Sequence, residues 1–120
     1  MNKVLIVEDN NLNMKLFCDL LSIKHYEVIT SKDGVGIPQM VKNQKPDLVL
    51  MDIQLKGISG IDIIKELKAD RETMHVPIIA ITAFAMKHDE IKITECGCDM
   101  YLSKPVSIDR FFEAVEKFIG

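Results

Sequence analysis

Short apolar runs alternate with longer amphipathic stretches along the whole chain. Most of the short runs contain β-branched residues and all are too short for buried helices, so they predict strands. These predicted strands cover residues 4–7, 27–30, 48–51, 76–81 and 100–102. The stretches between them repeat apolar residues every three or four positions, which predicts helices. The predicted helices cover residues 12–21, 33–44, 61–67, 86–96 and 108–119.

The five predicted helices differ in the clarity of their pattern. The last one has the strongest apolar stripe, and Ser107 before it is a suitable N-cap. The fourth has a thin apolar face. The second is the weakest, because Gly34, Gly36 and Pro38 fall in its first half and proline fits only near a first turn.

Five successive strand–helix units predict an α/β fold. Strands that are almost entirely apolar are typical of a parallel sheet covered by helices on both faces. The crossovers between parallel strands should be right-handed. Five strands are too few for an eight-stranded barrel and favour an open, doubly wound sheet. We therefore expect a (βα)5 domain with an open, doubly wound parallel sheet of five strands.

Composition narrows the classes of function. The chain has 120 residues, of which 48% are apolar and 28% charged, and this composition fits one packed domain. Its net charge of −3 argues against a nucleic-acid-binding face. No stretch has the length of a membrane helix, and the N-terminus lacks the shape of a signal peptide, so we expect a cytoplasmic protein without membrane insertion. Cys18, Cys96 and Cys98 are expected to be reduced thiols, since one C-x-C pair does not supply a zinc site.

Polar residues mark the ends of four predicted strands. Glu8 and Asp9 follow the first strand, Asp52 ends the third, Thr82 ends the fourth and Lys104 follows the fifth. In a parallel sheet these ends share one edge, which is where open α/β sheets bind ligands. Each residue alone has an ordinary interpretation as a helix cap, a turn residue, a packed hydroxyl or a surface lysine. Their joint placement predicts a site.

The charges of these residues indicate what the site holds. Three carboxylates and one lysine carry a net charge of −2, and carboxylates this close need a counter-ion. Oxygen ligands favour Mg²⁺, with Mn²⁺ as a possible substitute. A magnesium ion beside a lysine and a threonine is suited to bind phosphate oxygens.

At these residues the sequence resembles the receiver domain of bacterial two-component response regulators, over essentially the whole chain. The matching stretches are "VLIVEDNNLN", "PDLVLMDIQL", "ISG", "PIIAITAFA" and "YLSKPVS". The stretches "EDNNLNMKLF", "MDIQL" and "ITAFAMK" resemble in particular the DivK-type single-domain regulators of cell division. The resemblance implies a flavodoxin-like (βα)5 fold with strand order 2-1-3-4-5. It also implies a phosphorylation-dependent signalling protein rather than an enzyme, one that takes part only in its own Mg²⁺-dependent phosphotransfer and slow autodephosphorylation.

The resemblance also implies a role for each residue of the predicted site. Asp52 accepts a phosphoryl group from a phosphohistidine of a histidine kinase or phosphotransfer protein. Its phosphoryl oxygens are bound by Thr82, Lys104 and the N–H of Ala83. The implied Mg²⁺ ligands are Asp9, Asp52, the backbone carbonyl of Gln54 and, directly or through water, Glu8. The implied switch residues are Thr82 and Tyr101, whose ring turns inward when Thr82 moves.

Further features of the site loops follow from the resemblance. The Lys104-Pro105 peptide bond is expected to be cis, and Gln54 and Phe84 to line the approach of the attacking water. The chain departs from the family pattern at Lys56, where a proline is usual.

The resemblance implies that output passes through protein contacts. The last helix runs almost to the end of the chain, so we expect residues 1–120 to be a single receiver domain with no output domain. The expected partners are the phosphodonor, docking on the first helix at Leu12 and Phe17, and a downstream kinase or adaptor. We expect a monomer or weak dimer.

Two other functions are compatible with parts of this pattern. A degenerate receiver would bind partners without phosphorylation, although all key residues are present here. A phosphohydrolase of the haloacid dehalogenase type also uses an aspartate at a strand end with Mg²⁺, but it needs an acid two residues further on. That position is Gln54.

Overall fold

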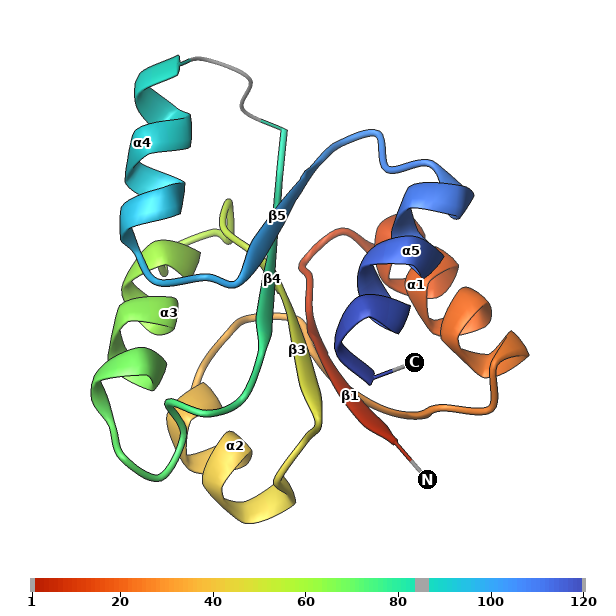
Figure 1. Cartoon of the computed structure of the whole chain (residues 1–120), viewed down its shortest axis with the longest axis horizontal. Helices are drawn as coiled ribbons and strands as arrows, with labels where there is room; N and C mark the ends of the chain where they lie inside the picture. Colours follow the sequence, from red (N-terminus) through yellow and green to blue (C-terminus); the bar gives the residue numbers. More distant parts are fainter. Residues whose placement is uncertain (1, 84–86, 120) are drawn as a thin grey trace.

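The computed structural model describes residues 2–83 and 87–119, with the backbone alone at residues 87–89. Its five strands form one parallel sheet in the order β2-β1-β3-β4-β5, which confirms the predicted flavodoxin-like topology (Figure 1). The strands are β1 (Lys3–Val7), β2 (Glu27–Ser31), β3 (Leu48–Asp52), β4 (Ile78–Thr82) and β5 (Met100–Ser103). The helices are α1 (Asn11–Ile23), α2 (Ile37–Gln44), α3 (Gly60–Ala69), α4 (Lys87–Glu95) and α5 (Ile108–Ile119).

Helices cover both faces of the sheet, α1 and α5 on one side and α2, α3 and α4 on the other (Figure 1). In β1, Val4 and Ile6 pack against the first pair of helices, whereas Leu5 and Val7 pack against the other three. Successive side chains of a strand point to opposite faces, so a central strand in this sheet has no polar face. This geometry explains why the strands are continuous apolar runs.

The second helix is shorter than its sequence pattern predicts. It begins at Ile37 rather than at residue 33, because Gly34 and Gly36 have φ angles of 75° and 71° and make a turn before it. Positive φ is a conformation that glycine adopts at low cost and that is incompatible with a continuing α-helix. Pro38 lies in the first turn, as expected.

Helix α1 turns only part of its predicted apolar stripe to the core: Phe17, Leu20 and Leu21 are buried. Leu12 and Leu16 are 80% and 41% exposed, whereas Phe17 is buried and stacks on Phe111 with ring centroids 5.2 Å apart. The predicted N-cap of α5 is confirmed, since Ser107 Oγ accepts a hydrogen bond of 3.2 Å from the N–H of Arg110. Within the described residues no helix is long and apolar enough to span a membrane.

Candidate functional site

The register of the sheet brings the predicted site residues to one edge. Val7 pairs with Met51 and Asp52 with Ile81, so Glu8 and Asp52 lie at the ends of adjacent strands. Thr82 pairs with Ser103, which places Lys104 one residue beyond the end of β5. The predicted convergence of these side chains is what the fold produces, because parallel strands all end on the same side.

Three carboxylates form the acidic part of the site. One oxygen from each of Glu8, Asp9 and Asp52 lies within 4.8 Å of the others. Glu8 and Asp52 are only 1% and 2% exposed, whereas Asp9 is partly exposed. Within the described part of the chain, no other group of three or more histidine, cysteine, aspartate and glutamate residues has this arrangement, and Cys96 and Cys98 belong to no such group.

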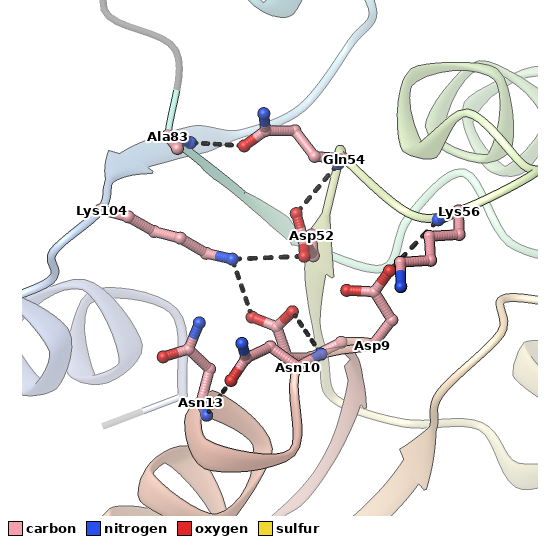
Figure 2. Close-up of polar contacts among 9 residues, drawn as sticks. Asp9, Asn10, Asn13, Asp52, Gln54, Lys56, Ala83 and Lys104 are labelled. Atoms are coloured by element: carbon pink, nitrogen blue, oxygen red, sulfur yellow. Dashed lines mark hydrogen bonds and ion pairs between the residues drawn. The ribbon is translucent and has the colours of Figure 1, made fainter.

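Lys104 supplies the positive charge of the site. Its Nζ lies 3.2 Å from Oδ2 of Asp52 (Figure 2). It also lies 3.1 Å from Oε1 of Glu8. Burial lowers the pKa of Lys104, but the two carboxylates outweigh this effect and hold its pKa above the usual value. The Lys104-Pro105 peptide bond is cis, as the family resemblance implies.

Glu8 is the carboxylate whose ionised form is disfavoured by the surroundings of the site. Burial, and then the neighbouring Asp52, raise the pKa of Glu8 from 4.5 to about 7, although Lys104 opposes this shift. Its Oε2 accepts a hydrogen bond of 3.3 Å from the N–H of Asn10, but Oε1 has ion-pair contact with Lys104 and no hydrogen bond. A buried carboxylate oxygen without a hydrogen bond is costly in the absence of a further cation.

These observations fit a divalent metal ion. The donor set consists of carboxylate oxygens, the formal net charge of the cluster with Lys104 is −2, and the buried Oε1 of Glu8 has only its ion pair with Lys104. Mg²⁺ prefers one or two carboxylates and keeps several waters, so the partly exposed Asp9 suits it. The residues that would hold it are Glu8, Asp9 and Asp52.

Gln54 contacts both sides of the site. Its backbone N–H donates a hydrogen bond of 2.9 Å to Oδ1 of Asp52, and its side-chain Oε1 accepts one of 2.7 Å from the N–H of Ala83 (Figure 2). From the sequence, Gln54 was expected to offer its backbone carbonyl to the metal and to line the approach of the attacking water, but no contact with Ala83 was expected. The side-chain contact joins residues of two strand ends, and no local pattern in the sequence signals it.

The loop after β3 is tied to the acidic cluster at the position where this chain departs from the family pattern. The N–H of Lys56 donates a hydrogen bond of 3.2 Å to Oδ2 of Asp9, which a proline cannot do. Gly60, at the start of α3, packs so closely on the strand end that a Cβ there would lie 2.4 Å from Cα of Ile53. The loop is therefore held at its middle by Lys56 and at its end by Gly60.

Asn10 is a functional neighbour that the sequence analysis did not identify. Its Oδ1 accepts a hydrogen bond of 3.0 Å from the N–H of Asn13, which caps α1, while its own N–H binds Glu8. An asparagine just before an amphipathic stretch is a known N-cap signal, so the cap was predictable in principle. Its second contact, to a buried carboxylate, depends on the tertiary structure.

Tyr101 lies next to the site on β5 but faces α4. Its ring packs against the cluster between the sheet and helices α2 to α4, and its hydroxyl donates a hydrogen bond of 2.7 Å to Oε1 of Glu90. This hydrogen bond is the main reason that the pKa of Tyr101 is raised. Phe84, which the sequence analysis placed near the attacking water, lies outside the described residues.

Comparison with known proteins identifies the class. The model of the response regulator receiver domain family matches residues 4–116, so this chain belongs to that family. Receiver domains are signalling modules of two-component systems, and their partners are histidine kinases or phosphotransfer proteins.

Individual relatives agree with this assignment. The chain is 50% identical to proteins named polar-differentiation response regulator DivK from Brucella anthropi and Brucella ovis, over 98% of this chain and 95% of each relative. It is also similar to the receiver domain of the sensor histidine kinase PA1611 from Pseudomonas aeruginosa, solved with a magnesium ion in its active site cleft. That match has a TM-score of 0.90 and 30% identity, covering 99% of this chain and 98% of the other. The fold matches the chemotaxis protein CheY4 from Vibrio cholerae with a TM-score of 0.89, 20% identity and 98% of both chains covered.

Proposed function

We propose that this protein is a phosphorylation-dependent switch whose phosphoacceptor is Asp52. The observation that carries the proposal is the meeting of Asp52 with Glu8, Asp9 and Lys104 at one sheet edge. The donor is a phosphohistidine of a histidine kinase or of a phosphotransfer protein. Two-component receivers as a family accept phosphoryl groups from such donors, and the chain has the residues that this reaction needs.

The transfer itself needs little from the protein besides position and charge. A carboxylate oxygen of Asp52 attacks the phosphorus, the P–N bond to the histidine breaks, and an acyl phosphate bond forms. The imidazole leaves with the electron pair and takes a proton from solvent. Lys104, already 3.2 Å from Asp52, and the N–H of Ala83 bind oxygens of the transferred group. Slow hydrolysis of the acyl phosphate then resets the protein.

The proposed Mg²⁺ ligands are Glu8, Asp9, Asp52 and the backbone carbonyl of Gln54, and Mn²⁺ is a substitute of the same ligand preference. When bound, the ion shields the approach of one anion to another and neutralises charge in transfer. Among these residues Glu8 acts directly or through water.

The proposed switch couples the phosphoryl group to the α4–β5 surface. Thr82 ends β4 and is fully buried, next to the strand that carries Tyr101. Movement of Thr82 toward the phosphoryl group makes room for the tyrosine ring, and the ring leaves Glu90 when it turns inward. This change alters the surface that a downstream kinase or adaptor contacts.

The proposed docking surface for the donor lies beside the site. A cavity of about 400 Å³ opens between α1 and the loop after β5, lined by Asn13, Leu16, Phe17, Ala83, Lys104, Pro105 and Val106. Lys104 thus belongs to both the cavity and the acidic site. Leu16 is an exposed part of this lining, whereas Phe17 is buried, and Leu12 is exposed on the same helix outside the lining.

The DivK relatives are named for polar differentiation, which supports a role in cell division or cell-cycle control. We also propose that the protein acts in the cytoplasm as a monomer or a weak dimer.

The decisive experiment is phosphorylation with acetyl phosphate and Mg²⁺, followed by intact mass measurement. We expect one phosphate adduct in the wild type and none in Asp52→Asn or when Mg²⁺ is chelated. Absence of a Mg²⁺-dependent adduct on the wild type would refute the phosphoacceptor role. Multiple turnover of phosphomonoesters would instead indicate a hydrolase. Equal affinity for a kinase partner before and after phosphorylation would leave the protein without a switch.

A further inference from the structure

The N–H of Ala83, which the proposed function assigns to the phosphoryl group, is already engaged in this structure. It donates a hydrogen bond of 2.7 Å to the carboxamide oxygen of Gln54 (Figure 2). This distance lies at the short end of the range for N–H···O hydrogen bonds. Ala83 follows Thr82 at the end of β4, so the occupied N–H is part of the site edge itself.

Gln54 is held in this position from its other end. Its backbone N–H donates a hydrogen bond of 2.9 Å to Oδ1 of Asp52. The residue therefore extends from the proposed phosphoacceptor on β3 to the end of β4, as Figure 2 shows. The other carboxylate oxygen of Asp52 faces Lys104 at 3.2 Å. Both oxygens of Asp52 thus have partners, and the side chain of Gln54 lies beside them.

A carboxamide oxygen and a phosphoryl oxygen both accept a hydrogen bond, and the backbone N–H has only one hydrogen to donate. One N–H forms one strong, linear hydrogen bond at a time. A phosphoryl oxygen on Asp52 can bind Ala83 only after Oε1 of Gln54 has left. We propose that the Gln54 side chain is an internal competitor that satisfies the Ala83 N–H in the unphosphorylated protein and is displaced by the phosphoryl group.

This inference rests on the proposed function and adds a positioning residue to it. The competitor keeps the Ala83 N–H satisfied in the resting state. On phosphorylation the hydrogen bond to Gln54 is exchanged for one to the phosphoryl group, and the lost bond weakens the net binding of that group. A typical net hydrogen-bond contribution corresponds to a change of about two- to tenfold in an equilibrium constant.

The test replaces Gln54 with methionine, which has a similar length but no comparable acceptor oxygen. Beryllium fluoride with Mg²⁺ is the probe, as an analogue of the phosphoryl group on an aspartate. We expect Gln54→Met to bind it about two- to tenfold more tightly than the wild type, by titration calorimetry. The amide proton of Ala83 in the free protein is expected to shift upfield in NMR spectra of the variant, because its hydrogen bond is lost.

The matched control is Gln39→Met. Gln39 is an exposed glutamine on α2. Within the described residues its side chain makes one hydrogen bond, of 3.0 Å, to Oδ1 of Asn43. The same chemical change there is expected to leave both the Ala83 resonance and the affinity for beryllium fluoride unchanged. The direction of the effect separates competition from mere structural support, since loss of a supporting contact weakens binding.

Three results would overturn the inference. An unchanged Ala83 resonance in Gln54→Met would mean that the contact is absent in solution. Equal or weaker binding of beryllium fluoride by this variant, with normal binding by the wild type, would refute the competition and leave the proposed function intact. A wild type that neither binds beryllium fluoride nor forms a phosphate adduct would refute the proposed function and the competition together.

Discussion

Charged side chains are exposed at the amino end of the sheet and buried at its carboxyl end. At the carboxyl end, Glu8 and Asp52 are almost completely buried and share one lysine, Lys104. At the amino end, Lys42 lies 2.9 Å from Asp70 and 3.6 Å from Glu72, and all three side chains are in contact with solvent. The amino end balances its charges in water, whereas the carboxyl end concentrates negative charge out of water.

This difference in charge burial locates the functional site better than the shape of the surface does. A cavity of about 690 Å³ opens at the amino end, lined by residues that include Lys42, Arg71 and Glu72. Its volume exceeds the 400 Å³ beside the proposed phosphorylation site. The functional end is recognised instead by uncompensated charge, because buried like charges are costly and persist where a ligand or reaction requires them.

The largest expected effect comes from removing the cation at each end. In Lys104→Met, two buried carboxylates lose their counter-charge, and we expect the free energy of unfolding to fall by about 3 kcal/mol in metal-free buffer. Urea titration measures this change. In the control Lys42→Met the ion pairs are solvent-exposed, so the urea midpoint is expected to stay almost unchanged. Equal losses in the two variants would remove the proposed difference between the ends.

The pH dependence of stability is expected to have opposite signs at the two ends. The pKa of Glu8 is raised from 4.5 to about 7, so the folded protein favours its protonated form. In metal-free protein, the stability that Glu8 contributes is fully present below the pKa of this residue in the unfolded chain. It is lost as pH rises through about 7, the pKa in the folded protein. The total loss is at most about 3 kcal/mol.

The carboxylate at the amino end serves as the comparison. The hydrogen bond from Lys42 lowers the pKa of Asp70, so its stabilising contribution is present at neutral pH and is lost as pH falls below its usual range. Urea titrations of the wild type, Glu8→Gln and Asp70→Asn between acidic and neutral pH measure both slopes. Glu8→Gln is expected to flatten the loss between pH 5 and 7.5, whereas Asp70→Asn leaves it in place; the reverse result would contradict the assignment.

The smallest expected effect concerns how backbone groups hold the acidic cluster. Lys56→Pro and Lys56→Ala both remove the side-chain charge, but only the proline removes the N–H that binds Asp9. We expect the proline variant to bind Mg²⁺ about two- to fivefold more weakly than the alanine variant, because Asp9 is less well oriented. Titration with Mg²⁺, followed by a spectroscopic signal, measures the affinities. Identical affinities would show that this hydrogen bond has no influence on the metal site.

The fold was predictable because its signals are local and repeated. Each strand is an apolar run with few polar interruptions, and five such runs separated by amphipathic stretches leave few alternatives. The error at α2 arose because glycines at positive φ replace its expected first turn. In α1 the row of leucines faces outward at Leu12 and Leu16, since the actual core face follows Phe17.

The candidate site was only partly predictable. The placement of Asp52, Thr82 and Lys104 after consecutive strands was visible in the sequence, because parallel strands must end together. The sequence gives no sign of the contacts from Gln54 to Ala83 and from Lys56 to Asp9, because these contacts join loops that are distant in the chain.

The sequence by itself thus determined the fold class, the family and the set of polar residues at the carboxyl edge of the sheet. These depend on periodicity and on the order of residue types, which the chain displays directly. Only the tertiary structure decided that Glu8 is buried with one oxygen paired only to Lys104, and that Gln54 occupies the Ala83 N–H. Burial and hydrogen-bond partners depend on which loops meet in space, and the distances that decide them are set by packing of the whole domain.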